Sequence, residues 1–237
     1  MHQKEQLLLK LKYQNEQLKD YAHLVSHDLK SSLRNLSALL AWVKEDCIEK
    51  IGEESVGNLN LMEAKIEKMD QFLEDIINYS EIGATSLKIT TVDLNKKVAE
   101  IINSITVPKN ITIIIKNNLP VIKADARRML QIFQNLISNA VNFNDKENGL
   151  VEIGVEETKE FYTFSVKDNG QGIPKEYQKK IFNTFTTLGY QEKSTGMGLS
   201  IVKRVLDLYG GDIWLESEVS KGSTFYFTIP KNQAIEA

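Results

Sequence analysis

Cysteine and proline are scarce in this chain of 237 residues, and each scarcity excludes a class of structure. Cys47 is the single cysteine, so the chain can form no internal disulfide and no multi-cysteine metal site. A reducing cytoplasm is the expected location. The first 82 residues contain no proline and are rich in Leu, Lys, Glu and Gln, which favours long helices over a packed mixed domain.

An excess of one charge and long hydrophobic runs are also lacking. The 29 basic and 32 acidic residues give a net charge of -3, and no concentrated basic stripe is present to neutralise phosphates. Apolar stretches such as 111–115 fall far short of the roughly 20 residues that span a bilayer, and no charged-then-apolar leader opens the chain. We therefore expect a soluble segment with no nucleic-acid partner, and the length favours two domains.

The first 82 residues are predicted to form a helical hairpin with a turn between Glu49 and Ser55. Apolar residues recur in alternating steps of four and three, which is typical of a coiled-coil seam. Two successive steps of four produce a stutter around His27. One hairpin leaves its seams half covered, so a dimeric four-helix bundle is expected. The seams comprise Leu7, Leu11, Gln14, Leu18, Tyr21, Val25, Leu29, Leu33, Leu36, Leu40, Val43 and Cys47, then Leu59, Met62, Ile66, Met69, Leu73 and Ile76.

From residue 83 onward, helical patterns alternate with short β-rich runs, which predicts a second domain over 83–237 after a first over 1–82. Helices on one face of a mixed, mostly antiparallel sheet would make an α/β sandwich, so the fold class is α+β with two domains. Helices are predicted over 92–105, 126–142 and 198–209, and strands over 111–116, 150–155, 161–167, 213–216 and 224–229.

Two asparagines on the second predicted helix of this domain carry the first chemical signal. Asn135 and Asn139 are four residues apart, so both amides project from one helical face. A carbonyl oxygen there can bind a hydrated Mg²⁺, and an amide can reach a phosphate oxygen. The alternative is that the asparagines only cap and decorate the helix, which would be the preferred interpretation of an isolated pair.

Glycine-containing segments after a predicted strand favour the nucleotide interpretation. In the run from Asp168 to Gly172, glycines allow close backbone approach, and the acid can accept the adenine amino hydrogens. Gly196 and Gly198 open the next helix, where backbone N–H groups and the helix dipole favour phosphate. The polar tract 189–195, which follows Phe182 and Phe185, is consistent with a mobile lid.

In combination, these motifs resemble the core of the sensor histidine kinases of two-component systems. The segment Ser26-His27-Asp28-Leu-Lys resembles the phosphoacceptor box of that family, and Asn135 to Ala140 resembles its asparagine box. Asp168 to Gly172, Phe182 to Phe185, Gly196 to Val202 and Lys221 to Phe225 resemble its remaining boxes. The resemblance covers nearly the whole chain and implies a Bergerat ATP fold behind a dimeric helical hairpin.

The resemblance implies roles for individual residues. His27 would attack the γ-phosphate of ATP with Asp28 as general base. A neutral imidazole nitrogen is a competent nucleophile near neutral pH when its other nitrogen is held by a base. Ser31 would position the water that hydrolyses a partner's acyl phosphate. Phe143 would stack on adenine, or would be a core aromatic at the helix end. The nucleotide set comprises Asn135, Asn139, Asn142, Phe143, Asp168, Gly170, Gly172, Ile173, Gly196, Gly198, Leu199 and Thr224, with Asn139 as the metal ligand.

Departures from the family pattern lie at three positions. Ser32 stands where proline is common, which predicts an unkinked helix. Asn142 stands where lysine is common, which predicts weaker ATP binding or slower transfer, with Lys146 or Lys193 as substitutes. Ser31 stands where threonine or asparagine is common, which leaves the strength of phosphatase activity open.

The main hypothesis is an ATP- and Mg²⁺-dependent homodimeric protein-histidine kinase that phosphorylates His27. The phosphoryl group would then pass to an aspartate of a separate response-regulator receiver domain, docked on the helix face around Lys30, Ser31 and Arg34. The alternative is a dimeric nucleotide-binding scaffold or degenerate kinase without phosphotransfer. We expect the chain to be the cytoplasmic output end of a longer sensor, which would reach a membrane only through parts absent from this sequence.

Overall fold

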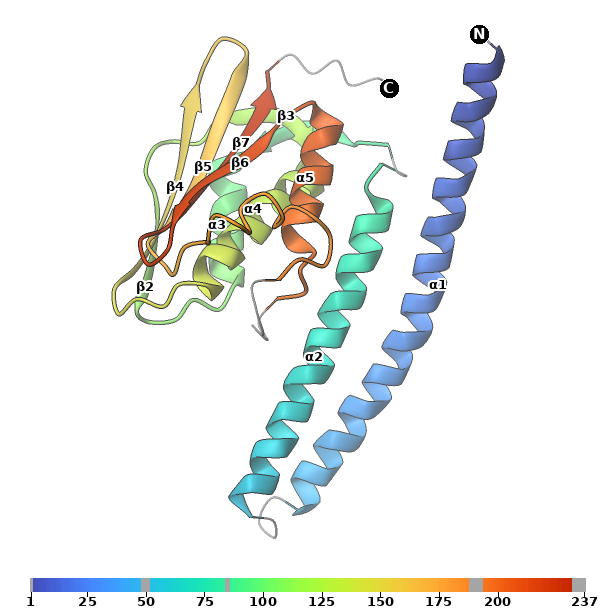
Figure 1. Cartoon of the computed structure of the whole chain (residues 1–237), viewed down its shortest axis with the longest axis vertical. Coiled ribbons are helices and arrows are strands. Elements are labelled where there is room, and N and C mark those ends of the chain that lie inside the picture. Colours follow the sequence, from blue (N-terminus) through green and yellow to red (C-terminus); the bar gives the residue numbers. More distant parts are fainter. Residues whose placement is uncertain (1, 48–51, 84–85, 188–193, 232–237) are drawn as a thin grey trace. The chain divides into compact units, whose positions relative to one another are not determined.

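The computed structural model describes residues 2–47, 52–83, 86–187 and 194–231, and the chain divides into two compact units (Figure 1). The first unit is built on the helices α1 (His2–Cys47) and α2 (Glu53–Glu81). The second unit holds the remaining elements. Within the described ranges, no helix combines the length and the apolar character that a membrane span requires.

The helices α1 and α2 form the expected hairpin. Leu33 and Leu40 of α1 and Leu73 of α2 are buried in it, and ion pairs join the helices at Lys30–Glu74 and Lys44–Glu63. The helix α1 runs unbroken through Ser32, as the absence of proline predicts. Cys47 ends α1, but its side chain and residues 49–51 of the predicted turn lie outside the described residues. The turn is shorter than predicted, because α2 already begins at Glu53.

The second unit contains a mixed sheet of five strands in the order β2-β4-β5-β7-β6. The pair β2–β4 is parallel and the other three pairs are antiparallel. Two helices, α4 and α5, pack on one face of the sheet, and α3 packs beside α4 (Figure 1). The strands are β2 (Ile111–Ile115), β4 (Gly149–Glu157), β5 (Phe161–Asp168), β6 (Ile213–Glu218) and β7 (Gly222–Pro230), and the helices are α3 (Leu94–Ser104), α4 (Ala126–Asn142) and α5 (Gly198–Tyr209).

A cluster of three phenylalanines joins α4 to the centre of the sheet. The Phe133 ring meets those of Phe164 and Phe227 edge-on, at centroid distances of 5.5 and 5.4 Å. Phe164 and Phe227 stack on adjacent strands at 4.9 Å. All three are buried, and such aromatic pairs stabilise a core beyond the area they bury. The cluster therefore fixes the helix that also carries Asn135 and Asn139.

The fold class is confirmed, with two additions that the sequence interpretation missed. Strands β1 (Ile89–Asp93) and β3 (Val121–Asp125) pair as a separate antiparallel ribbon. The predicted helix over 92–105 consequently starts later, because Val92 and Asp93 belong to β1 and the Asp93 carboxylate caps α3 by accepting from Lys96 N–H.

Candidate functional site

The carboxylate of Asp168 lies at the end of β5 and is almost fully buried. Its Oδ1 accepts backbone hydrogen bonds from Gly170 at 2.8 Å and Ser223 at 3.3 Å. Burial raises the pKa of the Asp168 carboxyl, and the two N–H bonds oppose that shift only in part. No donor to Oδ2 is present among the described residues, so this oxygen remains available to accept from a ligand.

Two positions near Asp168 must be glycine because other backbone segments lie directly against them. A Cβ on Gly170 would lie 2.6 Å from the carbonyl oxygen of Phe143. Gly172 has φ +69°, and a Cβ there would lie 2.1 Å from the Glu218 carbonyl oxygen. Both distances are shorter than any normal carbon–oxygen contact, so side chains at these positions would displace the loop. The loop is therefore held against the end of α4 and the β6–β7 turn.

Gly198, the first residue of α5, lies directly against Asn135 of α4. A Cβ on Gly198 would be 2.5 Å from Asn135 Oδ1. The Asn135 amide nitrogen donates to the Gln131 carbonyl at 2.8 Å, which orients the side chain. Two segments that are separate in the sequence thus meet at one place in the fold.

The remaining predicted residues of α4 lie along its last turn. Asn139 is half-buried, and its side chain has no hydrogen-bond partner among the described residues. Asn142 is exposed at the final position of the helix. Phe143 follows as the C-cap and is half-buried, and its carbonyl accepts from Gln171 N–H at 3.3 Å. The Phe143 backbone thereby joins the asparagine helix to the glycine loop.

The start of α5 and the sheet supply the other predicted positions. Gly196 has φ +74° and abuts the backbone of Phe185, while Leu199 is half-buried in the first turn of α5. Ile173 is buried behind the glycine loop. Thr224 is half-buried on β7, opposite Lys167. Residues 188–193, which include Lys193 and most of the predicted lid tract, lie outside the described residues.

Two residues that the sequence interpretation missed organise this region. Asn169 Oδ1 accepts from Leu150 N–H and from the Asn144 amide at 2.7 and 2.9 Å, while its own amide donates to the Asn148 carbonyl. Ser217 Oγ accepts from Ile173 N–H at 2.7 Å. Asn169 was visible in the sequence as the residue after Asp168, but no local pattern distinguishes Ser217.

The predicted phosphoacceptor pair, His27 and Asp28, lies on α1 in the first unit. The His27 and Asp28 side chains are 76% and 77% exposed, and His27 Nδ1 is 3.4 Å from Asp28 Oδ1. Asp28 thus faces Nδ1 of the imidazole and leaves Nε2 open to solvent. This arrangement is suited to nucleophilic attack by Nε2.

The two serines after the pair differ in their hydrogen bonding. Ser32 Oγ donates to the Asp28 carbonyl at 3.2 Å, whereas the exposed Ser31 hydroxyl has no partner among the described residues. Lys30 is engaged with Glu74 and is largely covered, so it is not the exposed docking cation that the sequence suggested. Ser31 and Arg34 remain exposed on this helix face.

Residues 124–233 match the family of histidine kinase-, DNA gyrase B- and HSP90-like ATPases. Cyanobacterial phytochrome B of Nostoc is 33% identical over 231 residues, which are 94% of this chain and 31% of the phytochrome. The sensory kinase SasA of Prochlorococcus marinus is 32% identical over 244 residues, covering 94% of this chain and 63% of SasA. The chain thus spans about a third of the phytochrome and under two thirds of SasA.

Solved structures agree with these relatives. The catalytic domain of histidine kinase ThkA is 33% identical, with a TM-score of 0.51 over 61% of this chain and 96% of that domain. A second ThkA structure, solved in complex with the response regulator TrrA, is 24% identical, with a TM-score of 0.61 over 93% of this chain and 66% of ThkA. At that identity the second match shows the fold alone.

The second unit is therefore an ATP-binding domain of the histidine kinase and DNA gyrase class. The similarity to the sensory kinase SasA covers 94% of this chain and therefore extends into the helical hairpin. The chain belongs to the sensor histidine kinases of two-component signalling.

Proposed function

We propose that the chain transfers the γ-phosphoryl group of ATP to His27 and then to an aspartate of a response-regulator receiver domain. The observation that carries the proposal is the pairing of an exposed His27 with Asp28 at Nδ1, in a chain whose other unit is an ATP-binding domain. A histidine held at one nitrogen and open at the other is an activated nucleophile.

The first step of the transfer takes place at His27 on α1. The lone pair of His27 Nε2 forms a bond to the γ-phosphorus, the bond from that phosphorus to the β,γ-bridging oxygen breaks, and ADP leaves with the electron pair. The imidazole becomes more acidic as the new bond forms, and Asp28 Oδ1 accepts the proton of Nδ1. Asp28 therefore stabilises the positive charge that develops on the ring.

The donor side is assigned to the region where α4 meets the start of α5 and the glycine loop. Asp168 Oδ2 would accept from the adenine amino group, and Phe143 would stack on the ring. Gly196, Gly198 and Thr224 would face the phosphates or lid, and Ile173 and Leu199 would wall the adenine.

Asn139 fits a magnesium ligand because its amide is half-buried, lies on the helix face that carries Asn135 and has no hydrogen-bond partner among the described residues. Mg²⁺ accepts neutral oxygen ligands, keeps several waters and relies on substrate phosphates, so one amide can suffice. When bound, the ion offsets charge on the phosphates. Asn135 would reach a phosphate oxygen, and the exposed Asn142 would leave that region without the lysine common in the family.

We also propose that a second copy of the chain covers α1. Leu33 and Leu40 are each only 9% exposed, whereas Leu29, Leu36 and Val43 on the adjacent face remain 48%, 51% and 46% exposed. Apolar residues that recur on one helical face and remain half-exposed favour burial against another helix. A four-helix bundle formed by two hairpins would bury them.

The partner of the phosphorylated histidine would be a receiver domain, as in the ThkA–TrrA complex. The exposed face with Ser31 and Arg34, one to two turns after His27, would contact it. Ser31 would also position a hydrolytic water in the reverse, phosphatase reaction, because its hydroxyl is free to do so while that of Ser32 is bonded to the Asp28 carbonyl.

Incubation with γ-labelled ATP tests the proposal. We expect label that is stable to alkali and labile to acid, lost in His27→Gln and retained in His23→Gln. His23 is a matched control because it lies one turn away on the same helix, where its Nε2 is 3.3 Å from Glu81 Oε1. Nucleotide binding without label would overturn the proposal and favour a scaffold or degenerate kinase.

The route of transfer can be read from mixed dimers. If the phosphoryl group passes between subunits, mixing His27→Gln with Asp168→Asn restores label on the second protein. If transfer occurs within one subunit, neither protein is labelled in the mixture.

A further inference from the structure

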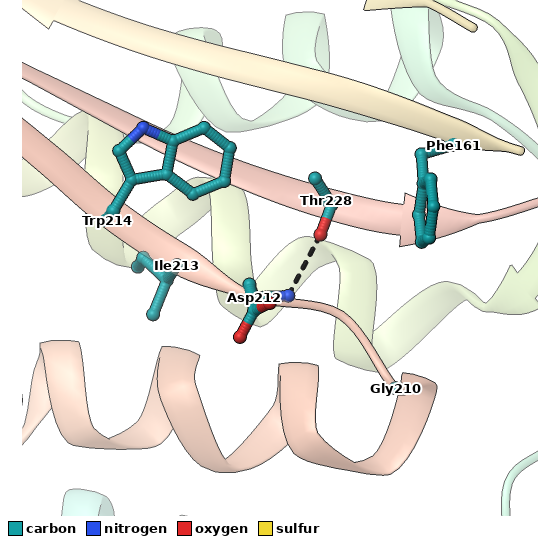
Figure 2. Close-up of a pocket in the computed structure, with 6 residues that line it drawn as sticks. All are labelled: Phe161, Gly210, Asp212, Ile213, Trp214 and Thr228. Atoms are coloured by element: carbon teal, nitrogen blue, oxygen red, sulfur yellow. Dashed lines mark hydrogen bonds between the residues drawn. The ribbon is translucent and has the colours of Figure 1, made fainter.

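A pocket of about 530 Å³ lies in the second unit at the junction of α5, β6 and β7, and no step of the kinase proposal uses it. It is lined by Phe161, Gly210, Asp212, Ile213, Trp214 and Thr228. Figure 2 shows Trp214 and Phe161 at opposite ends of this group, with Thr228 between them. The pocket thus combines two aromatic rings with a single charged group, a carboxylate.

The backbone at Asp212 is held in place independently of its side chain. Asp212 N–H donates to Thr228 Oγ1 at 2.9 Å (Figure 2). Thr228 N–H in turn donates to the Asp212 carbonyl at 2.9 Å. A Cβ on Gly211 would be 2.0 Å from the Thr228 carbonyl oxygen, so only glycine allows the loop to lie this close to β7. The carboxylate of Asp212 is exposed and has no ion-pair partner among the described residues.

The last turn of α5 carries an acid and no basic residue. The helix ends at Tyr209 with Gly210 as its left-handed cap, and its last turn contains Asp207 but no basic residue. A helix C-terminus carries partial negative charge and favours cations, so an acid in the last turn is unfavourable by itself. Asp212 adds a further negative charge beside the pocket. These charges favour a cationic ligand.

The aromatic side chains at the pocket also favour a cationic ligand. Trp214 is 40% exposed and stacks on Tyr226 of the adjacent strand, with ring centroids 5.4 Å apart. The electron-rich face of tryptophan attracts ammonium and guanidinium groups that come within about 6 Å. The stacked rings of Trp214 and Tyr226 form an aromatic platform that extends beyond the pocket. This platform is larger than one cationic group needs, so it can also contact the residues that flank the cation.

The same domain already uses this combination for one of its own lysines. Lys231 forms an ion pair with Glu157 and lies 4.8 Å from the centroid of the Tyr162 ring. An aromatic ring and a carboxylate thus bind an ammonium group in the same sheet, at the residue after Phe161 of the pocket. The pocket offers equivalent groups, Trp214 or Phe161 with Asp212, to a cation that this chain does not supply among its described residues.

We infer that the pocket is a docking site for an arginine or lysine side chain of a partner protein. The cation would lie over the Trp214 ring and pair with Asp212, and the neighbouring residues of the partner would contact the Trp214–Tyr226 platform. Arginine fits best, because its flat guanidinium can stack on the indole while donating to a carboxylate. The site would couple this outer end of the sheet to another protein, separately from phosphoryl transfer.

Fluorescence of Trp214 in a Trp42→Phe background tests the inference. The probes are acetyl-Gly-Arg-Gly-amide and its citrulline counterpart, which has the same shape without charge. We expect a saturable change with the arginine peptide at low salt and at least about fivefold weaker binding of the citrulline peptide, since a single exposed ion pair with cation–π contact contributes on the order of 1 kcal/mol.

Variants localise the effect. Asp212→Asn should weaken binding of the arginine peptide at least fivefold, because it removes the negative charge. The loop should keep its conformation, because the Asp212 side chain makes none of the hydrogen bonds to Thr228. Glu54→Gln, which removes the same charge from an exposed position on α2, should leave the affinity unchanged. The inference is overturned if no saturable change occurs, if citrulline binds as well as arginine, or if Asp212→Asn and Glu54→Gln behave alike. The assay contains no ATP, so its outcome is independent of the kinase proposal.

Discussion

Asp168→Asn separates the contribution of this residue to ATP binding from its contribution to folding. Oδ1 of Asp168 accepts the backbone N–H groups of Gly170 and Ser223, and an asparagine oxygen can accept both. The group that changes is Oδ2, which becomes an NH₂ donor. If adenine presents its amino group there, two donors would face each other in the variant.

The expected loss of affinity follows from the type of bond removed. Hydrogen bonds to a charged acceptor contribute about 1.5–3 kcal/mol, so the Kd for ATP should rise about 10- to 150-fold. The carboxylate must be ionised to accept fully. Because burial raises the pKa of Asp168, wild-type affinity for ATP should also fall as the pH is lowered through that raised value, before most other carboxylates titrate.

The stability of the Asp168→Asn variant should not fall with its affinity for ATP. A raised pKa means that the Asp168 carboxyl holds its proton more tightly in the folded chain than in the unfolded chain. The contribution of Asp168 to the free energy of unfolding therefore falls as the pH rises from its pKa in the unfolded chain through its pKa in the folded chain. At pH 7 the buried charge opposes folding in full. Asp168→Asn should therefore melt at the wild-type temperature or above at pH 7, and the difference should vanish below the unfolded pKa.

Calorimetric titration with ATP and thermal unfolding at several pH values measure both effects. Asp70→Asn, an exposed change of the same kind in the interior of α2, is the control and should alter neither. Unchanged ATP affinity in Asp168→Asn would refute the adenine contact. A melting temperature well below wild type would show instead that the carboxylate is needed for the loop itself.

Three further changes have expected outcomes. Asn142→Lys should lower the Kd for ATP or speed autophosphorylation several-fold, because it adds a cation at an exposed helix end near the proposed phosphates. Ser31→Thr should raise dephosphorylation of the receiver, measured by loss of label from the phosphorylated regulator, since the bulkier side chain restricts the hydroxyl. Gly172→Ala should destabilise the fold by more than about 1 kcal/mol in denaturant unfolding, because φ is +69° and a Cβ would lie 2.1 Å from a carbonyl oxygen.

Two of these changes have a matched comparison variant, and the third has a result that would refute it. Ser32→Ala should not change dephosphorylation, because that hydroxyl is bonded to the Asp28 carbonyl; an equal effect of both serines would refute the assignment of Ser31. Gly57→Ala lies in α2 with nothing within 4 Å and should stabilise by about 1 kcal/mol. If Asn142→Lys leaves ATP affinity and autophosphorylation unchanged, the missing lysine is not limiting.

Local patterns predicted most of the elements. The helices α4 and α5 begin and end at the predicted residues, because each has a strong apolar period and, in α4, an N-terminal aspartate, Asp125, whose carboxylate accepts two N–H groups of the first turn. The ribbon of β1 and β3 was missed because each strand is five residues long and is stabilised by pairing with a segment about thirty residues away.

The sequence by itself determined the class of this protein, because the histidine box, the asparagines and the glycine segments are each short and contiguous. Only the tertiary structure decided which of those segments meet and which groups remain free. It places Gly198 against Asn135, directs Asp28 to Nδ1 of His27 and engages Lys30 with Glu74. It also joins Asp212 to Thr228 beside two aromatic rings. Except for the adjacent His27 and Asp28, these contacts join residues 16 to 63 positions apart, so they depend on how helices and strands pack, which no local pattern encodes.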